Sequence, residues 1–157
     1  MRSALNLSLP DHLDIAGGAA GKVHPARRFT AAHRLLKPEE YEQVFNATGH
    51  AAGQSAVQKT APRGYQSSGG GVTVRAIRNG SSLPRLGLII SKKSIRRAVD
   101  RNRVKRLVRE GFRLCQTRLS GLDVVIMSRA GLGELPNPKL RAVLDKHWDA
   151  LARWRAR

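Results

Sequence analysis

One stretch, residues 98–118, restricts the possible fold of this chain more than any other. At about 100° per residue, counted from Val104, the apolar residues gather on one side of a helix; they are Val104, Leu107, Val108, Gly111, Phe112, Leu114 and Cys115. The opposite side carries Asn102, Lys105, Arg106, Arg109 and Arg113. Such a helix buries one face against a partner and leaves the other in water. The stretch therefore predicts a globular domain built on a long helix with a cationic outer face.

Positive charge is concentrated around this predicted helix. The formal net charge is +18 over 157 residues, and residues 75–118 carry +12 of it, with only Asp100 and Glu110 as acids. A field of one sign destabilises a fold through self-repulsion, so its presence indicates a function. The partner it favours is a polyanion, with nucleic acid as the first choice and a merely basic, solvated face as the alternative.

The other elements follow from periodicity and turn signals. Tyr41 and Phe45 lie one helical turn apart and share a face, and Asn79-Gly80 predicts a turn that joins two strands in a hairpin. The strand at 122–128 contains the continuous apolar run 124–127, which predicts burial. The expected elements are a helix at 38–45, strands at 72–77, 85–91 and 122–128, the helix at 98–118 and a last helix at about 139–154.

The order α-β-β-α-β-α predicts a small α+β sandwich, a central sheet with helices on one face. Residues 1–28 have the composition of a flexible N-terminal extension, and residues 46–70, rich in Gly, Ala and Ser, that of a disordered insertion. Residues 155–157 form a short basic tail after a domain at 29–154. The single cysteine excludes an internal disulfide, no apolar run reaches the roughly 20 residues of a membrane span, and Asp11 and Asp14 interrupt any secretory signal.

The basic segment resembles a known family. Arg101-Asn102-Arg103-Val104-Lys105-Arg106-Leu107-Val108-Arg109-Glu110 is similar to the RNR signature of the protein component of bacterial ribonuclease P. Residues 34–45, 84–93 and 122–129 resemble that family's first helix, second strand and third strand, so the likeness covers roughly 29–154. The resemblance implies the same α-β-β-α-β-α sandwich with a left-handed βαβ crossover, although the general rule for crossovers is right-handed.

The resemblance also implies a function. Ribonuclease P is an endoribonuclease that removes the 5′ leader from precursor tRNA, and its RNA subunit, with bound Mg²⁺, is the catalyst. The protein is then an accessory subunit that binds the ribonuclease P RNA and the precursor leader and lowers the Mg²⁺ requirement. No catalytic group, protein-bound metal or cofactor, membrane contact or obligate protein partner is expected of this chain, and a bacterial, cytoplasmic protein is implied.

Two sets of site residues follow from the resemblance and the charge pattern. Contacts to the catalytic RNA are expected from Lys92, Lys93, Arg96, Arg97, Arg101, Asn102, Arg103, Lys105, Arg106, Arg109 and Arg113, since Arg and Lys match phosphate oxygens. The precursor leader is expected in a cleft lined by Tyr41, Phe45, Thr73, Arg75 and Ile89, where bases can rest on side chains. For the two aromatic residues, a place in the core is the alternative.

Two other functions compete with the accessory subunit. A protein nuclease would need clustered carboxylates for metal ions or an acid–base pair, and the basic segment holds only Asp100 and Glu110. A ribosomal protein or RNA chaperone shares the size and charge, but it gives no reason for the RNR signature together with the aromatic pair. Cleavage that requires a specific RNA subunit would distinguish the first reading from both.

Overall fold

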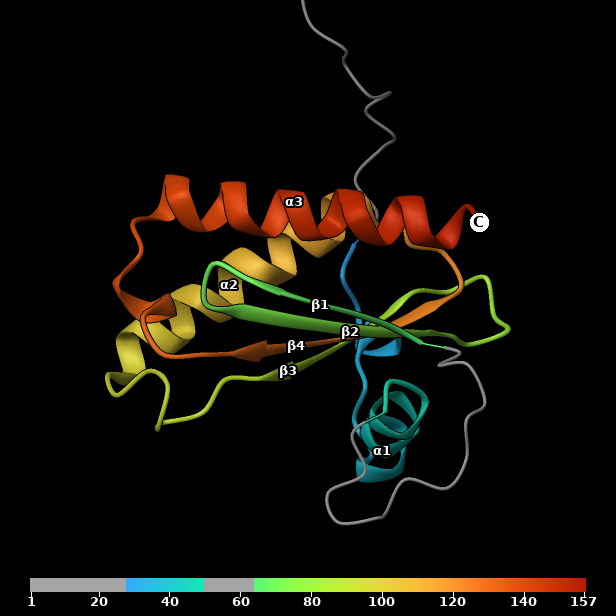
Figure 1. The fold of residues 1–157 in the computed structure, drawn as a ribbon, viewed down its shortest axis with the longest axis horizontal. Coiled ribbons are helices and arrows are strands. Elements are labelled where there is room, and N and C mark those ends of the chain that lie inside the picture. The colour runs from blue at the N-terminus through green and yellow to red at the C-terminus, as the bar shows by residue number, and fades with distance from the viewer. Residues whose placement is uncertain (1–27, 50–63) are drawn as a thin grey trace, which may run out of the picture.

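The computed structural model describes residues 28–49 and 64–157 (Figure 1). Four strands form one sheet in the order β1-β2-β4-β3, in which β1 and β2 are antiparallel, β2 and β4 are antiparallel, and β3 and β4 are parallel. The elements are η1 (Ala31–His33), α1 (Pro38–Ala47), β1 (Tyr65–Gly69), β2 (Val72–Arg78), β3 (Arg85–Ile89), α2 (Ala98–Cys115), β4 (Leu122–Ser128), η2 (Leu132–Glu134) and α3 (Asn137–Arg155).

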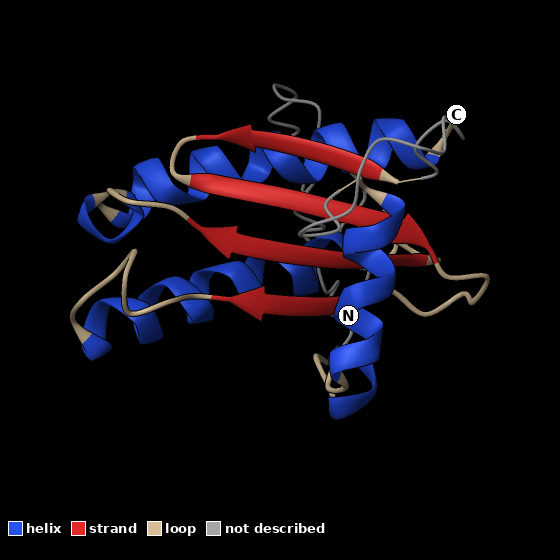
Figure 2. Cartoon of the chain, turned by 60° about the horizontal axis from the view of Figure 1, so that its bottom comes forward, coloured by secondary structure: helices blue, strands red, loops and turns tan. Residues whose placement is uncertain are grey.

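Helices cover both faces of the sheet, not one face as the sequence predicted (Figures 1 and 2). Helices α2 and α3 lie together on one face, and α1 lies across the other. The reason is that α1 has an apolar side of its own: Val44 is fully buried there beside Val125 of β4. The sheet therefore has a large core under α2 and α3 and a small one under α1.

The large core joins α2 to α3 and both helices to the sheet. The buried side of α2 consists of Val104, Val108 and Phe112, whereas Leu114, predicted on this side, is 65% exposed. Gly111 of α2 faces Trp148 of α3 so closely that a Cβ atom would lie 2.6 Å from Trp148 Nε1. Glycine in this helix thus permits a close approach of α2 to α3.

A fourth strand corrects the predicted insertion at 46–70. Residues 46 and 47 belong to α1, and residues 65–69 form β1, which pairs along its whole length with β2. The turn between them consists of Gly70 and Gly71, with φ angles of 59° and 78°, which is the pattern of a two-residue type I′ hairpin. The composition around these glycines predicted a loop. Residues 50–63, and the extension at 1–27, lie outside the described residues.

The predicted hairpin of the strands at 72–77 and 85–91 is wrong, because β4 lies between β2 and β3. Three consecutive residues of β4, Val124 to Ile126, are fully buried, and a strand buried on both faces belongs in the middle of a sheet. Strand β3 reaches its parallel neighbour β4 through α2. Figure 2 shows the sheet from the α1 side, with α2 behind it. Seen instead from the α2 side, with both strands pointing up, β4 lies to the left of β3. The crossover is therefore left-handed, as the resemblance implies.

Within residues 28–49 and 64–157, none of the helices is long and apolar enough to cross a membrane.

Candidate nucleic-acid interface

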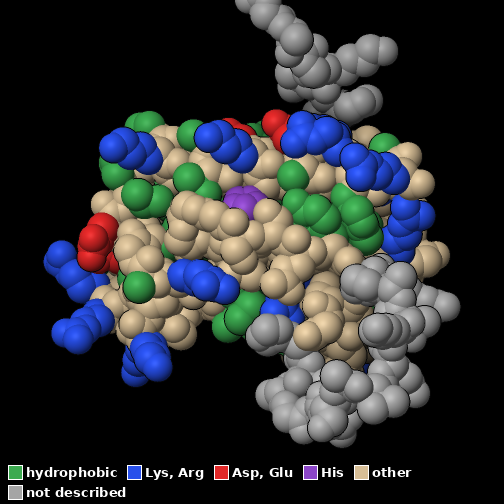
Figure 3. Space-filling model, in the orientation of Figure 1, with side chains coloured by type: hydrophobic (Ala, Val, Ile, Leu, Met, Phe, Trp, Pro, Cys, Tyr) green, Lys and Arg blue, Asp and Glu red, His purple; other side chains and the backbone are tan. Residues whose placement is uncertain are grey.

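The turn before α2 is folded around one buried side chain. Ile95 is only 4% exposed, and its backbone N–H donates to the carbonyl of Ser91 at 3.1 Å. The Ser94 N–H donates to Ser91 Oγ, also at 3.1 Å. Because Ile95 points inward, the flanking Lys92, Lys93, Arg96 and Arg97 are left exposed. Lys and Arg side chains project at this end of the molecule (Figure 3).

Eight of the eleven residues predicted to bind RNA lie on this turn and on the outer side of α2; six of them are exposed, and Lys105 and Arg109 are half-buried. We call these eight the outer cationic row: Lys92, Lys93, Arg96, Arg97, Asn102, Lys105, Arg106 and Arg109. Arg97 lies 3.9 Å from Asp100, the limit of an ion pair. None of the other cations of the row has an ion pair or side-chain hydrogen bond with another described residue. The row is therefore a surface whose positive charge is almost uncompensated.

The three remaining arginines are engaged within the protein. The Arg101 guanidinium donates to the carbonyls of Ile95 and Arg96, at 3.0 and 2.6 Å, and so fixes the turn. Arg113 pairs with Glu110 at 2.6 Å, and this hydrogen bond holds the pKa of the Glu110 carboxyl below its ordinary value. The predicted RNA contacts of these two arginines compete with internal partners.

Arg103 ties α2 to the segment that begins α3. Its Nη1 donates to the Leu135 carbonyl at 2.9 Å and to Asn137 Oδ1 at 2.8 Å, and its Nη2 donates to the Gly133 carbonyl at 2.6 Å. Three oxygens thus hold one guanidinium across the gap between the two helices. Arg103 of the signature is therefore a structural clamp between α2 and the segment that leads into α3.

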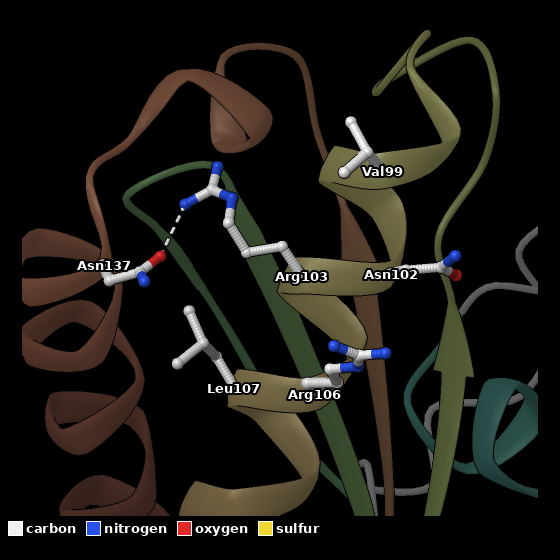
Figure 4. A pocket seen from close by; sticks show the side chains of 6 residues that line it. All are labelled: Val99, Asn102, Arg103, Arg106, Leu107 and Asn137. Atoms are coloured by element: carbon white, nitrogen blue, oxygen red, sulfur yellow. Dashed lines mark hydrogen bonds between the residues drawn. The ribbon is translucent and has the colours of Figure 1, made fainter.

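A pocket opens beside this clamp (Figure 4). Arg103 crosses from α2 toward Asn137, while Val99 and Leu107 present aliphatic surface above and below it. The residues that line the pocket are Val99, Asn102, Arg103, Arg106, Leu107 and Asn137.

The five residues predicted for the leader cleft all lie on the sheet face that carries α1, which we call the cleft face. Tyr41, Phe45 and Ile89 belong to the small apolar cluster there. Side chains alternate between the two faces along a strand, so Thr73 and Arg75 of β2 lie on the same face as Ile77, which packs on this cluster. The structure brings these five residues together on one face of the sheet, whereas α2, which carries half of the outer cationic row, lies on the opposite face (Figures 1 and 2).

Tyr41 is held against the sheet. Its hydroxyl donates to the Leu35 carbonyl at 3.1 Å. A Cβ atom at Gly87 of β3 would lie 2.6 Å from the Tyr41 ring, so only glycine leaves room for it. Tyr41 is therefore partly buried and packs against the small core, as the alternative prediction for it had it.

An ion-pair network fixes the start of α1 on the sheet. Arg85 of β3 donates to both carboxylate oxygens of the buried Asp123, at 2.8 and 2.5 Å, and to Glu40 of α1 at 2.5 Å. Glu40 also accepts the backbone N–H groups of Lys37 and Leu36, and these bonds, together with Arg85, hold the pKa of its carboxyl below the ordinary value. The network sets the position of the two aromatic residues over the sheet.

Arg75 is a buried cation on the cleft face. The residue is 3% exposed, its guanidinium carbon lies 5.0 Å from the centre of the Phe45 ring, and Nη1 donates to Thr48 Oγ1 at 3.2 Å. Its Nε has no hydrogen-bond partner. Burial, and then the positive charge of Arg129, lower the pKa of the Arg75 guanidinium.

Arg129, which is not among the residues predicted for the cleft, lies beside this buried cation. Its Nε donates to Thr73 Oγ1 at 2.7 Å. Neither arginine has an ion pair to an acid among the residues that the structure describes. Two neighbouring cations without a counter-ion can accept a phosphate. Side chains along a strand alternate between its two faces. Because Val125 lies on the cleft face, a residue four positions later, Arg129, is expected on the same face, and this signal could have identified it as a site residue.

In residues 28–49 and 64–157, no group of three or more His, Cys, Asp or Glu side chains is close enough to hold a metal ion. Cys115 is partly buried, and burial raises the pKa of its thiol. This cysteine therefore packs as a small apolar residue, as the sequence predicted.

Comparison with known proteins shows the family of this chain. The family model described as Ribonuclease P matches residues 29–152. The ribonuclease P protein component of Pseudomonas putida strain GB-1 is 43% identical over 128 residues, which are 81% of this chain and 84% of that protein. That of Pseudomonas aeruginosa PAO1 is 41% identical over 133 residues, 84% of this chain and 87% of that protein.

Solved structures have the same fold. A mutant of the Staphylococcus aureus RNase P protein with defective mRNA degradation activity aligns with a TM-score of 0.61 at 21% identity, over 78% of this chain and 89% of that chain. The RNase P protein from Thermotoga maritima aligns with a TM-score of 0.56 at 25% identity, over 76% of this chain and 96% of that chain.

Proposed function

Since this chain belongs to the ribonuclease P protein family, in which tRNA 5′ processing is the general role, we propose that it is the accessory protein subunit of a ribonuclease P ribonucleoprotein. In this proposal the outer cationic row binds the catalytic RNA, and the cleft face binds the 5′ leader of precursor tRNA. The catalyst is the RNA subunit.

One observation carries the assignment of the RNA surface. Along the turn and α2, cations project into solvent with almost no acidic partner in the described part of the chain. Guanidinium and ammonium groups held at helical spacing match successive phosphates of an RNA backbone. A solvated face without a partner would mix both signs of charge, so the row favours a polyanion.

The cleft face has a different chemistry, which suits a single strand. Phe45 and Tyr41 supply aromatic surface, and Arg75 and Arg129 supply positive charge beside it. Single-stranded RNA is held by this combination, because bases stack on aromatic side chains while cations bind the backbone. A mature tRNA has no leader, so the cleft face distinguishes precursor from product.

Mg²⁺ is assigned to the RNA subunit, where it supplies activated water and charge neutralisation at the scissile phosphate. The two acids of α2 do not compete for it, because Glu110 bonds to Arg113 and Asp100 lies near Arg97 and Arg103. The protein lowers the Mg²⁺ requirement by placing its own cations between two polyanions. We propose a cytoplasmic location, where both RNAs reside.

The test is cleavage of precursor tRNA by a bacterial ribonuclease P RNA at low Mg²⁺, with and without the protein. Mature 5′ ends that appear only when both components are present support the accessory role. Cleavage by the protein alone would place the catalyst in this chain. Binding of RNA without any gain in cleavage would favour a general RNA-binding protein.

A further inference from the structure

The pocket between α2 and the start of α3 has features that phosphate binding does not require. Its volume of about 580 Å³ lies within the ~300–1,000 Å³ typical of small-ligand sites. Its wall includes Leu107 and Val99, and Val99 is 63% exposed although it is aliphatic. A phosphate gains nothing from such a surface, whereas a flat, partly apolar ligand does.

The clamp at Arg103 also fixes a hydrogen-bond donor in this pocket. Arginine has donors only, so the Asn137 atom that faces its Nη1 must be the oxygen, at 2.8 Å. The Asn137 amide nitrogen is then turned away from Arg103, toward Leu107 (Figure 4). It makes no hydrogen bond with any described residue, and so it remains available to a ligand acceptor.

Charge around the pocket indicates what kind of ligand enters. Arg106, a member of the outer cationic row, lines the pocket together with Asn102. The polar ends of both side chains lie on the side of α2 that faces away from Asn137, at the rim (Figure 4). Guanidinium planes stack on bases and bind phosphates. An aliphatic wall, a fixed amide donor and an arginine at the rim together match one unpaired nucleotide of RNA, with its base inside and its phosphate at Arg106.

We propose that this pocket, formed by Val99, Leu107, Asn102, Arg106 and Asn137, binds one unpaired nucleobase of the catalytic RNA, and that Arg103 is a positioning residue that orients Asn137 toward it. The base has an acceptor atom on its edge for the Asn137 amide. This inference rests on the proposed function, since it takes the RNA on α2 to be the ribonuclease P RNA.

The experiment compares Val99→Ser with Leu114→Ser as a matched control. Both remove an exposed aliphatic side chain from α2, 63% and 65% exposed respectively, but only Val99 lines the pocket. Affinity for ribonuclease P RNA is measured over a series of salt concentrations. We expect Val99→Ser to weaken binding about fivefold, because a base loses apolar contact, and to leave the salt slope unchanged, because no phosphate contact is lost. Leu114→Ser should behave as the wild type.

A second readout identifies the base directly. Chemical probing of the RNA with base-specific reagents should show one unpaired base that the wild-type protein protects and that becomes reactive again with Val99→Ser or Asn137→Ser. Thermal melting checks that each variant is folded. Wild-type affinity for Val99→Ser, an equal loss with Leu114→Ser, or a changed salt slope would overturn the pocket assignment. Failure of the wild-type protein to prefer this RNA over an unrelated RNA would instead overturn the proposed function.

Discussion

The two faces of this molecule carry positive charge in opposite ways. The outer cationic row places many exposed cations in a line, without aromatic residues and almost without acids. The cleft face has few cations, and the main one, Arg75, is 3% exposed under the Phe45 ring. The outer cationic row is therefore suited to long-range electrostatic attraction of RNA, and the cleft face to short-range contact with it.

This difference predicts different physics of binding. Exposed cations that meet RNA release counterions, so affinity through the row should fall steeply with salt. Contacts on the cleft face combine stacking with a buried charge that salt screens less. Substitutions on the two faces should therefore differ in how their loss of RNA affinity depends on salt, as well as in how large that loss is.

The largest effect is expected from Arg106→Ala combined with Arg109→Ala. Neither side chain has an ion pair within residues 28–49 and 64–157, so the fold should be unaffected. Two lost charge-assisted contacts should weaken binding of ribonuclease P RNA about a hundredfold at low salt and flatten the salt slope by nearly one unit per contact. Filter binding across a salt series measures both quantities.

Arg113→Ala is the matched control on the same helix, because its guanidinium is already paired with Glu110. It should change affinity and slope far less than either outer arginine. An unchanged slope in the double variant would contradict the phosphate contacts that the row is assigned.

Arg103→Ala tests whether Arg103 stabilises the fold, in contrast to the arginines of the outer cationic row. The variant leaves the carbonyls of Gly133 and Leu135 without their donor, so we expect a loss of about 2 kcal/mol in the free energy of unfolding. Arg106→Ala should be neutral in the same denaturant titration. Equal stability of the two variants would show that the clamp contributes nothing to the fold.

This contrast also shows what the sequence could and could not predict. The helical wheel separated apolar from cationic residues on α2, because solvent exposure follows the helical period. The wheel left Arg103 off the cationic side, but it could not show that Arg103 is clamped, because the carbonyls that hold it come from residues 133 and 135, which only the tertiary fold brings near. Contacts between distant segments decide which cations are free.

The sheet shows the same limit. Strands β2, β3 and β4 were predicted within two residues of their bounds, but the pairing of β2 with β3 was wrong because turn signals report only local geometry. The apolar run of β4 predicted burial, and the structure shows that this burial comes from a central place in the sheet. Strand β1 was missed because Gln66, Ser67 and Ser68 lack an apolar alternation, and its place is fixed by the Gly70-Gly71 turn and by β2.

On the cleft face, Phe45→Ala should weaken affinity for precursor tRNA about tenfold, as expected for the loss of one stacking platform, with little change for mature tRNA. Its salt slope should stay close to that of the wild type. Phe45→Leu keeps apolar packing on α1 without the ring and controls for unfolding. Equal losses for precursor and mature tRNA would favour the core reading of Phe45.

The smallest effect concerns Glu40, which anchors α1 to Arg85. Its pKa in the folded protein is lowered from the ordinary 4.5 by the backbone N–H groups of Lys37 and Leu36 and by Arg85. The folded state therefore binds this proton less readily than the unfolded state, and the stability it contributes is complete above pH 4.5 and is lost as the pH falls through the folded pKa.

Glu40→Gln should accordingly be less stable than the wild type at pH 7, and the difference should shrink as the pH falls below 4.5. Denaturant titrations at several pH values measure it. Because Glu40 holds only α1, the variant should weaken precursor binding slightly and leave binding of the catalytic RNA unchanged. A loss in catalytic RNA binding of the same size would mean that the two faces are coupled through the sheet rather than independent.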